Sequence, residues 1–193
     1  MARSKSFDQD AVLDRAAELF WERGYEGTSM ADLEAHLGLG RQSLYNAFGD
    51  KQALFLKVLE RYRKEAMREP ISVLTAPGAG LEAIRAYFRD MIEHLTAATP
   101  RRACLVANTI VERGSQDAEA LLSCNIARAA LERALRRALT QARQEGEIAA
   151  ECDLESLVTL LVAQSYGLAV LAKTGVAAEE MHAAVEALLA GVR

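Results

Sequence analysis

Three glycines limit the length of any helix in the first fifty residues. Gly24, Gly38 and Gly49 each follow a short segment with apolar residues at helical spacing. Glycine takes the left-handed backbone conformation that ends many helices without steric cost. We therefore expect three short helices that end at these glycines. Their predicted starts are near Ser6 to Asp8, at Thr28 or Ser29, and at Arg41, and Asp50 is expected to cap a fourth helix from Lys51 to about Arg68.

The rest of the chain is also predicted to be helical. Alanine, leucine, glutamate and arginine favour helix and dominate the composition, whereas aromatic residues make up only 6%. Further helices are expected over 81–95, 99–113, 117–145, 153–173 and 179–189, with a loop at 75–80. The predicted fold class is all-α. We expect a three-helix N-terminal domain over residues 1–50 and a C-terminal helical domain over residues 51–193.

Residues 28–48 have the pattern of a helix-turn-helix, in which the second helix lies in the major groove of DNA. Two short helical segments are joined by a tight turn that contains Gly38 and Gly40. Apolar side chains can hold the two helices together: Leu33, Leu37, Leu39, Leu44 and Phe48. The side chains left to face outward are Arg41, Gln42, Ser43, Tyr45 and Asn46. Arginine, glutamine and asparagine can each pair with a base edge through two hydrogen bonds. The alternative is a helical hairpin with no role in DNA binding.

The overall charge does not indicate a nucleic-acid-binding protein. The formal net charge is −4, and the first fifty residues hold five basic and nine acidic side chains. A DNA-binding chain of this kind must concentrate positive charge locally. The DNA-binding hypothesis therefore depends on the geometry of the helix-turn-helix.

The N-terminal region resembles the TetR family of bacterial repressors over about residues 8–60. The matching residues are Phe20, Gly24, Tyr25, Thr28, Ser29, Asp32, Leu33, Gly38, Ser43, Leu44, Tyr45, Phe48 and Lys51. The resemblance implies that Thr28, Tyr45 and Lys51 contact phosphates. It also implies that Arg41 and Gln42 reach base edges. The predicted DNA-binding set is Thr28, Ser29, Arg41, Gln42, Ser43, Tyr45, Asn46 and Lys51. Two positions depart from the family pattern: Gly40 replaces the usual small hydroxyl residue that caps the helix, and Gln42 replaces a small residue.

A helix over 154–171 is apolar on almost every side, and such a helix must be buried. The final helix together with a second subunit is the expected cover, and Leu161 and Leu168 are expected to lie on the dimer face. The resemblance implies that the last two helices of each subunit form a four-helix bundle in a homodimer. The alternative is a helix in the core of a monomer.

Cys104 is a candidate redox sensor. It follows Arg101 and Arg102, near the start of a helix that Thr99 and Pro100 are expected to open. Nearby cations and a helix N-terminus lower the pKa of a thiol and make it more reactive. Residues 103–105 and Lys173 are similar to the NemR-like, electrophile-responsive branch of the family, although Ala103 stands where that branch has glycine. The alternative is that Cys104 is a small buried apolar residue.

Other classes of site find little support in the sequence. Candidates for a ligand pocket between helices in the C-terminal sensing domain are Phe88, Met91, Asn108 and Tyr166. No metal-ligand spacing and no cofactor-binding motif occur, and Cys104 with His94 is the only nucleophile–base pair that can be assembled. The uncharged stretch over 156–172 is shorter than a membrane span, and the chain is expected to be cytoplasmic.

The predicted function is a sequence-specific, operator-binding repressor, released by an unknown small molecule or electrophile. The alternatives are a helical enzyme and a protein-binding scaffold without DNA activity.

Overall fold

A computed structural model describes residues 7–97 and 104–192, and all regular structure in these ranges is helical. The prediction of an all-α fold is confirmed. The helices are α1 (Gln9–Arg23), α2 (Met30–Leu37), α3 (Arg41–Phe48), α4 (Lys51–Lys64), α5 (Arg68–Thr75), α6 (Leu81–Ala97), α7 (Leu105–Arg113), α8 (Ala118–Gln144), α9 (Leu154–Lys173) and α10 (Ala178–Ala190).

The caps of the first helices are those that the sequence predicts. The Asp8 carboxylate accepts hydrogen bonds from the backbone N–H groups at the start of α1. Ser29 caps α2 in a reciprocal arrangement with Asp32. Gly24 and Gly38 end these helices with positive φ angles of 76° and 67°, a conformation that glycine adopts at little cost. Local sequence alone therefore sets the lengths of α1 and α2.

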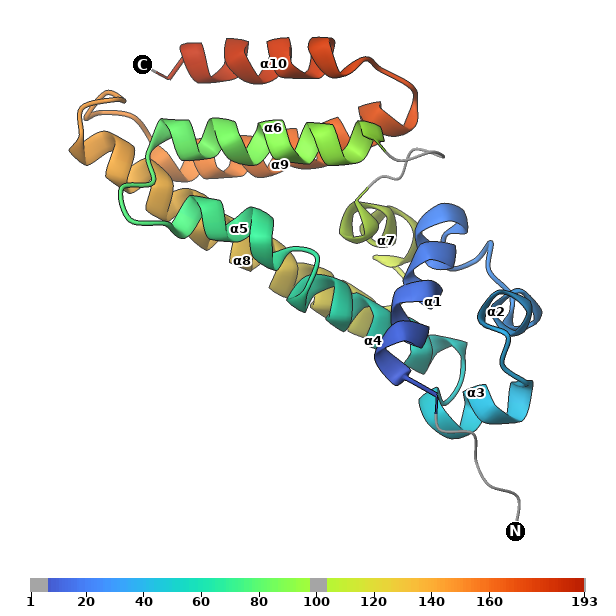
Figure 1. Ribbon diagram of the computed structural model, residues 1–193. Coiled ribbons are helices and arrows are strands. Elements are labelled where there is room, and N and C mark those ends of the chain that lie inside the picture. The colour runs from blue at the N-terminus through green and yellow to red at the C-terminus, as the bar shows by residue number, and fades with distance from the viewer. Residues whose placement is uncertain (1–6, 98–103, 193) are drawn as a thin grey trace.

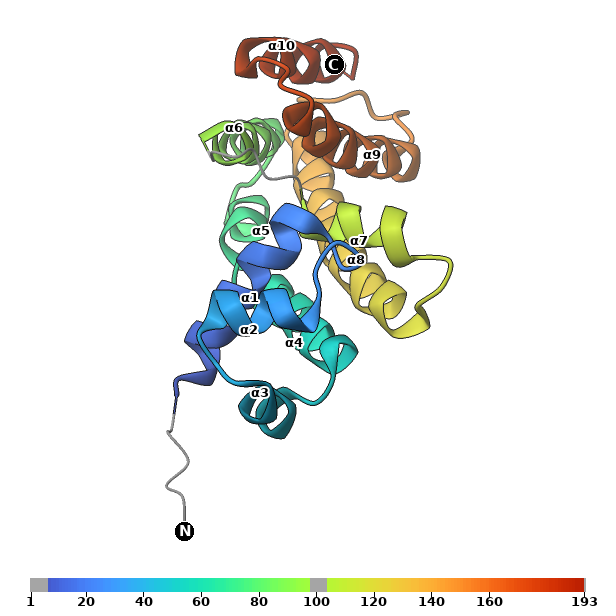
Figure 2. The same cartoon turned by 90° about the vertical axis from the view of Figure 1, so that its right-hand side faces the viewer.

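The two larger hydrophobic cores of the described residues lie toward opposite ends of the long helix α8. Figure 1 shows α1–α4 at one end, and α6, α9 and α10 at the other. Figure 2 shows α10 lying above α6 and α9. The N-terminal core extends from Val12 on α1 to Leu59 on α4 and also includes Leu105 and Ala120. Residues of α4 thus belong to the core of the first three helices. The division of the chain at residue 50 stays a prediction.

The fourth helix is shorter than predicted. It ends at Lys64, and the sequence analysis missed the separate helix α5 that follows. Pro70 explains the break, because it has no N–H to bond to the carbonyl of Ala66 and its ring would collide with that carbonyl in a continuous helix. In α5, Pro70 lies in the first turn, where a missing N–H costs nothing. Helix α7 begins after Cys104, and the predicted start at Thr99 and Pro100 lies outside the described residues.

The assignment of Leu161 and Leu168 to a dimer face is wrong. Both side chains are fully buried within the single chain, where α9 packs against α6 and α8. The apolar residues that α9 exposes are Leu160, Val170 and Leu171, which are 49%, 52% and 43% accessible. By length and composition α9 could also cross a membrane, but a core helix of a soluble protein passes the same test.

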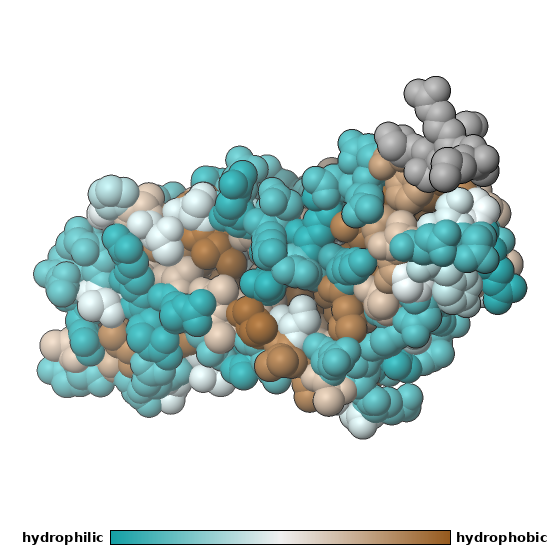
Figure 3. Space-filling view, turned by 90° about the horizontal axis from the view of Figure 1, so that it is seen from below, coloured by the Kyte–Doolittle hydropathy of each residue, from teal (hydrophilic) through white to brown (hydrophobic). Residues whose placement is uncertain are grey.

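A smaller group of apolar side chains is exposed where α7 meets α8. Val111, Leu122 and Ile126 are 85%, 62% and 42% accessible. Figure 3 shows a face that is mostly hydrophilic, with apolar side chains gathered near its middle. Exposed apolar residues therefore occur on α7 and α8 as well as on α9.

Candidate nucleic-acid interface and interior cavity

Helix α3 separates an apolar face from a polar one. Leu44 and Phe48 are buried in the N-terminal core. The side chains of Arg41, Gln42, Ser43, Tyr45 and Asn46 are all exposed, as the sequence analysis predicts. Gln42 Nε2 donates a hydrogen bond to Asn46 Oδ1 at 2.9 Å, and the Arg41 guanidinium lies 5.8 Å from the centre of the Tyr45 ring. The arrangement presents hydrogen-bonding groups and one cation to solvent along a single helix face.

Thr28 does not belong to this exposed surface. Its side chain is fully buried, and its hydroxyl donates a hydrogen bond to the carbonyl oxygen of Gly24 at 2.7 Å. The predicted phosphate contact through this hydroxyl is therefore corrected. Ser29, next to it, is exposed, and its hydroxyl and backbone N–H both bond to the Asp32 carboxylate.

Lys51 also points into the protein rather than away from it. Its ammonium group donates hydrogen bonds to the carbonyl oxygens of Tyr25 and Thr28, each at 3.0 Å, and lies 3.9 Å from the centre of the Tyr25 ring. Two of its three N–H donors are thus used to hold the loop between α1 and α2. In this geometry the ammonium bonds to the chain's own backbone, and its contact with a phosphate stays a prediction.

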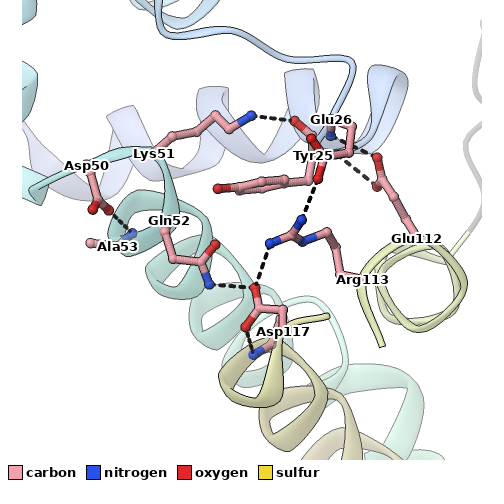
Figure 4. A network of polar contacts seen from close by, with 10 residues as sticks. Tyr25, Glu26, Asp50, Lys51, Gln52, Ala53, Glu112, Arg113 and Asp117 are labelled. Carbon is pink, nitrogen blue, oxygen red and sulfur yellow. Dashed lines mark hydrogen bonds and ion pairs between the residues drawn. The ribbon is translucent and has the colours of Figure 1, made fainter. Parts of the chain in front are cut away.

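The end of α7 holds the same loop from the other side (Figure 4). The backbone N–H groups of Tyr25 and Glu26 donate to the two carboxylate oxygens of Glu112 at 2.9 and 2.8 Å. A Cβ at Gly24 would come within 2.8 Å of the same oxygens, so this position requires glycine for space as well as for its positive φ. The Arg113 guanidinium lies 4.3 Å from the centre of the Tyr25 ring and bonds to the Glu26 carboxylate.

We refer to Lys51, Glu112 and Arg113 as the loop clamp. Figure 4 shows Lys51 and Arg113 on opposite sides of the Tyr25 ring. Cations over both faces of one ring interact with its negative electrostatic potential. Glu112 and Arg113 were not predicted from the sequence, because nothing in their local pattern points to a loop 86 residues earlier.

Asp117 connects the loop clamp to α8 and α4. Its carboxylate accepts hydrogen bonds from Gln52 Nε2 at 2.5 Å and from the backbone N–H of Ala120 at 2.9 Å, and it pairs with Arg113 at 3.5 Å. Burial alone would raise the pKa of Asp117. The hydrogen bonds and the Arg113 charge outweigh burial and hold the pKa below its usual value. The carboxylate is therefore charged at neutral pH, although Asp117 is only 7% exposed.

A cavity of about 540 Å³ lies between the N-terminal helices and the C-terminal helices. Its described lining comes from several helices and comprises Trp21, Tyr62, Glu65, Ala66, Met67, Glu69, Pro70, Ile71, Val73, Tyr87, Asp90, Met91, His94, Leu95, Cys104 and Ala169. Of the four predicted pocket residues, Met91 lines this cavity. Phe88 is fully buried in the C-terminal core, and neither Asn108 nor Tyr166 belongs to the lining.

Cys104 lines the cavity, but its surroundings differ from those predicted. Burial raises the pKa of the Cys104 thiol, and the Tyr62 hydroxyl lies 3.9 Å from its sulfur. The expected lowering of this pKa is therefore wrong, because loss of water outweighs the helix N-terminus. Arg101 and Arg102 lie outside the described residues. Lys173 is exposed at the end of α9, and no contact joins it to Cys104 in the described structure.

Among residues 7–97 and 104–192, no three side chains of His, Cys, Asp or Glu are grouped as metal ligands. The described site comprises an exposed polar helix face, a clamped loop and a largely apolar cavity that opens to solvent.

Comparison with known proteins gives one consistent result. Residues 12–58 match the model of the bacterial regulatory proteins of the tetR family, and residues 80–188 match a tetracyclin repressor-like C-terminal domain. The HTH-type transcriptional regulator YezE of Bacillus subtilis strain 168 is 37% identical over 174 residues, which cover 90% of each chain. The HTH-type transcriptional repressor ComR of Escherichia coli K12 is 31% identical, over 93% of this chain and 86% of ComR.

Solved structures agree with these matches. A cysteine mutant of the TetR-family regulator CifR, in complex with a 26-bp operator duplex, is 33% identical, with a TM-score of 0.85 and coverage of 97% of this chain and 98% of CifR. Reduced E. coli NemR has a TM-score of 0.82 over 96% of this chain and 98% of NemR, but it is 18% identical and shows the fold alone. The chain therefore belongs to the TetR family of bacterial transcriptional regulators, which confirms the prediction of a DNA-binding regulator rather than an enzyme.

Proposed function

We propose that this chain is a cytoplasmic, homodimeric repressor that binds an operator through α3 and leaves it when a small molecule occupies the cavity. The observation that carries the proposal is the exposed polar face of α3, where Arg41, Gln42 and Asn46 stand free of the core. These are the side-chain types that pair with purine edges in the major groove. The operator complex of CifR, a relative of the same fold and 33% identical, supports this assignment.

The outer faces of α9 and α10 support a dimer. On α9, Leu160, Ala163, Gly167 and Val170 are exposed along one side, and α10 exposes a series of alanines. Small residues let helices of a second subunit approach closely, and exposed Leu160 and Val170 provide apolar area to bury. A two-fold dimer would place its two copies of α3 about 34–36 Å apart, or a multiple of that spacing, to read two half-sites.

The cavity supports release by a ligand, because its wall includes a residue of the DNA-reading part. Trp21 lies on α1, about one turn after Ala17 and four residues before Tyr25. A molecule that contacts Trp21 can favour one position of α1 over another, which is what an effector must do to shift operator affinity.

Thiol modification is a second candidate for release, because Cys104 lies in the cavity wall. Its raised pKa leaves little thiolate at neutral pH. An electrophile would thus have to be concentrated by the cavity before it reacted. Lys173 is a proposed partner of Cys104 only in this second candidate.

The test begins with selection of bound duplexes from a random DNA pool, followed by gel shifts on the selected sequence. Arg41→Ala is expected to weaken binding to the selected duplex much more than binding to unrelated DNA. Arg137→Ala, an exposed change on α8, is the matched control and is expected to bind like the wild type. Absence of any selected sequence, with folded dimeric protein, would refute the operator-binding proposal.

A further inference from the structure

The inner wall of the cavity is rich in aromatic rings. Trp21, Tyr62 and Tyr87 come from α1, α4 and α6, and the Trp21 and Tyr62 rings meet edge to face with centroids 5.1 Å apart. Most of the remaining wall consists of aliphatic and thioether side chains, among them Met67, Ile71, Met91 and Leu95. The volume of about 540 Å³ is typical of sites that enclose one organic molecule. This wall suits a ligand with an apolar or aromatic body.

The charged residues in the described part of the cavity lining are all acidic. Glu65, Glu69 and Asp90 belong to the described lining, which contains neither lysine nor arginine. All three are exposed, and they therefore lie where the cavity opens to solvent.

These carboxylates are not neutralised by the cations of the described chain. Glu65 and Glu69 form no ion pair with a residue in 7–97 or 104–192, and Asp90 pairs only with its exposed neighbour Arg89 at 3.7 Å. Lys64, which directly precedes Glu65, pairs with Glu60 at 2.6 Å, and Arg61, one turn earlier, is held by Asp14 at 2.5 and 2.8 Å. Negative charge therefore remains available at the opening.

We propose that the cavity binds an organic cation, with the apolar body of the ligand against the aromatic wall and its positive charge near Glu65, Glu69 and Asp90. Aromatic faces attract cations through the ring quadrupole, and carboxylates do so through their charge. A neutral ligand of the same shape would gain only the apolar contacts. An anion would be repelled by all three carboxylates. This names the class of effector for the function proposed above, but binding of the cation does not depend on operator release.

Two probes of nearly equal size and opposite charge test the inference directly. Tetraphenylphosphonium and tetraphenylborate ions have the same tetrahedral shape and the same four phenyl groups. Trp21 is the only tryptophan of the chain and lines the cavity, so its fluorescence reports occupancy. The full-length protein is expected to bind the phosphonium at least about tenfold more tightly than the borate. The two ions differ in charge but not in shape, and the aromatic rings and carboxylates attract a cation and repel an anion.

Charge-neutral variants separate the site from the general negative charge of the protein. The combined variant Glu65→Gln, Glu69→Gln and Asp90→Asn is expected to lose most of the preference for the phosphonium. The matched control replaces three exposed carboxylates outside the cavity with glutamine, at Glu93, Glu119 and Glu151, and removes the same total charge. The control is expected to keep the preference. Circular dichroism and light scattering on both variants confirm that each is folded with the oligomeric state of the wild type.

Three results would overturn the proposal: equal affinity for the two ions, tighter binding of the borate, or equal loss of the preference in both triple variants. An operator gel shift with the phosphonium distinguishes this failure from failure of the proposed function. If the phosphonium binds with the expected preference and the operator complex persists, the ligand class stands and the release mechanism is wrong. If operator binding is never observed but the preference holds, only the repressor proposal fails.

Discussion

Removal of the Glu112 side chain should show how strongly α7 holds the DNA-reading helices. The Glu112 carboxylate accepts hydrogen bonds from the backbone N–H groups of Tyr25 and Glu26 at 2.9 and 2.8 Å. A hydrogen bond to a charged group contributes about 1.5–3 kcal/mol. The bond to Tyr25 is partly buried, whereas the bond to Glu26 is exposed and is discounted for screening by water. Glu112→Ala is therefore expected to lower the free energy of unfolding by about 3 kcal/mol.

The expected change in melting temperature is large enough to measure. For a chain of about this length, 1 kcal/mol corresponds to roughly 2–4 °C, so a loss of about 3 kcal/mol lowers Tm by about 6–12 °C. Glu112→Gln should fall between the wild type and Glu112→Ala. Its amide oxygen can accept one of the two bonds, but its amide N–H₂ faces the other backbone N–H. Operator affinity should also fall by about tenfold, because α2 and α3 are held less firmly at the geometry that DNA requires.

Thermal unfolding followed by circular dichroism and operator titration by fluorescence anisotropy measure the two effects. Glu119→Ala, at an exposed position on α8 with no ion pair to a described residue, is the matched control and should change neither quantity. If Glu112→Ala melts and binds DNA like Glu119→Ala, the carboxylate does not hold the loop, and the reasoning about the loop clamp is refuted.

The remaining predictions concern the dimer, the DNA contact and the thiol. Leu160→Glu should give a folded monomer by light scattering. Leu161→Glu should give unfolded protein, because it buries a charge in the subunit core. A folded Leu161→Glu monomer would contradict this assignment. Arg41→Ala should weaken operator binding by about 1–3 kcal/mol with unchanged Tm. Lys51→Ala should lower Tm, because its ammonium holds two carbonyl groups. The reverse pattern in melting and anisotropy would contradict the assignment of Arg41 to the DNA contact and of Lys51 to the loop clamp. In a variant that keeps only Cys104, alkylation by iodoacetamide should be slower than that of free cysteine at neutral pH, because burial raises the pKa of the thiol. Its rate should still rise with pH where that of free cysteine has reached a plateau, and a plateau at the same or a lower pH would contradict the burial argument.

The features that sequence predicts well are those set by neighbouring residues. Gly24 and Gly38 end their helices with positive φ, and Asp50 caps α4 by accepting the backbone N–H of Ala53 at 2.8 Å. The exposed and buried sides of α3 follow from the spacing of Leu44 and Phe48. Each of these depends on contacts within one helix or turn, and local sequence contains the whole cause.

The features that sequence predicts poorly depend on residues that are distant along the chain. Lys51 bonds to carbonyl groups more than 20 residues before it, and Thr28 is buried where the same loop packs. The apolar pattern of α9 has no polar side, and it could not decide whether Leu161 or Leu160 faces a partner. Cys104 has the local features that lower a thiol pKa, but the packing around it raises that pKa instead. In each case tertiary packing decided what the local pattern left open.

Helix α7 offers a direct physical connection between the cavity and the DNA-reading helices. Its N-cap, Cys104, lines the cavity, and its last turn carries Glu112 and Arg113, which hold the α1–α2 loop. A helix of nine residues is about 13 Å long and transmits a displacement of one end to the other with little bending. To move a repressor from almost fully bound to almost fully released, a ligand must prefer one state by about 5.5 kcal/mol. A molecule that contacts Trp21 on α1 and Cys104 at the start of α7 acts on both sides of the loop clamp at once. Contacts with two elements can therefore contribute to the difference in its binding free energy between the two states. On this reasoning, Glu112→Ala should weaken the coupling between cavity and operator as well as operator binding itself, because it cuts one of those two connections and leaves the cavity intact.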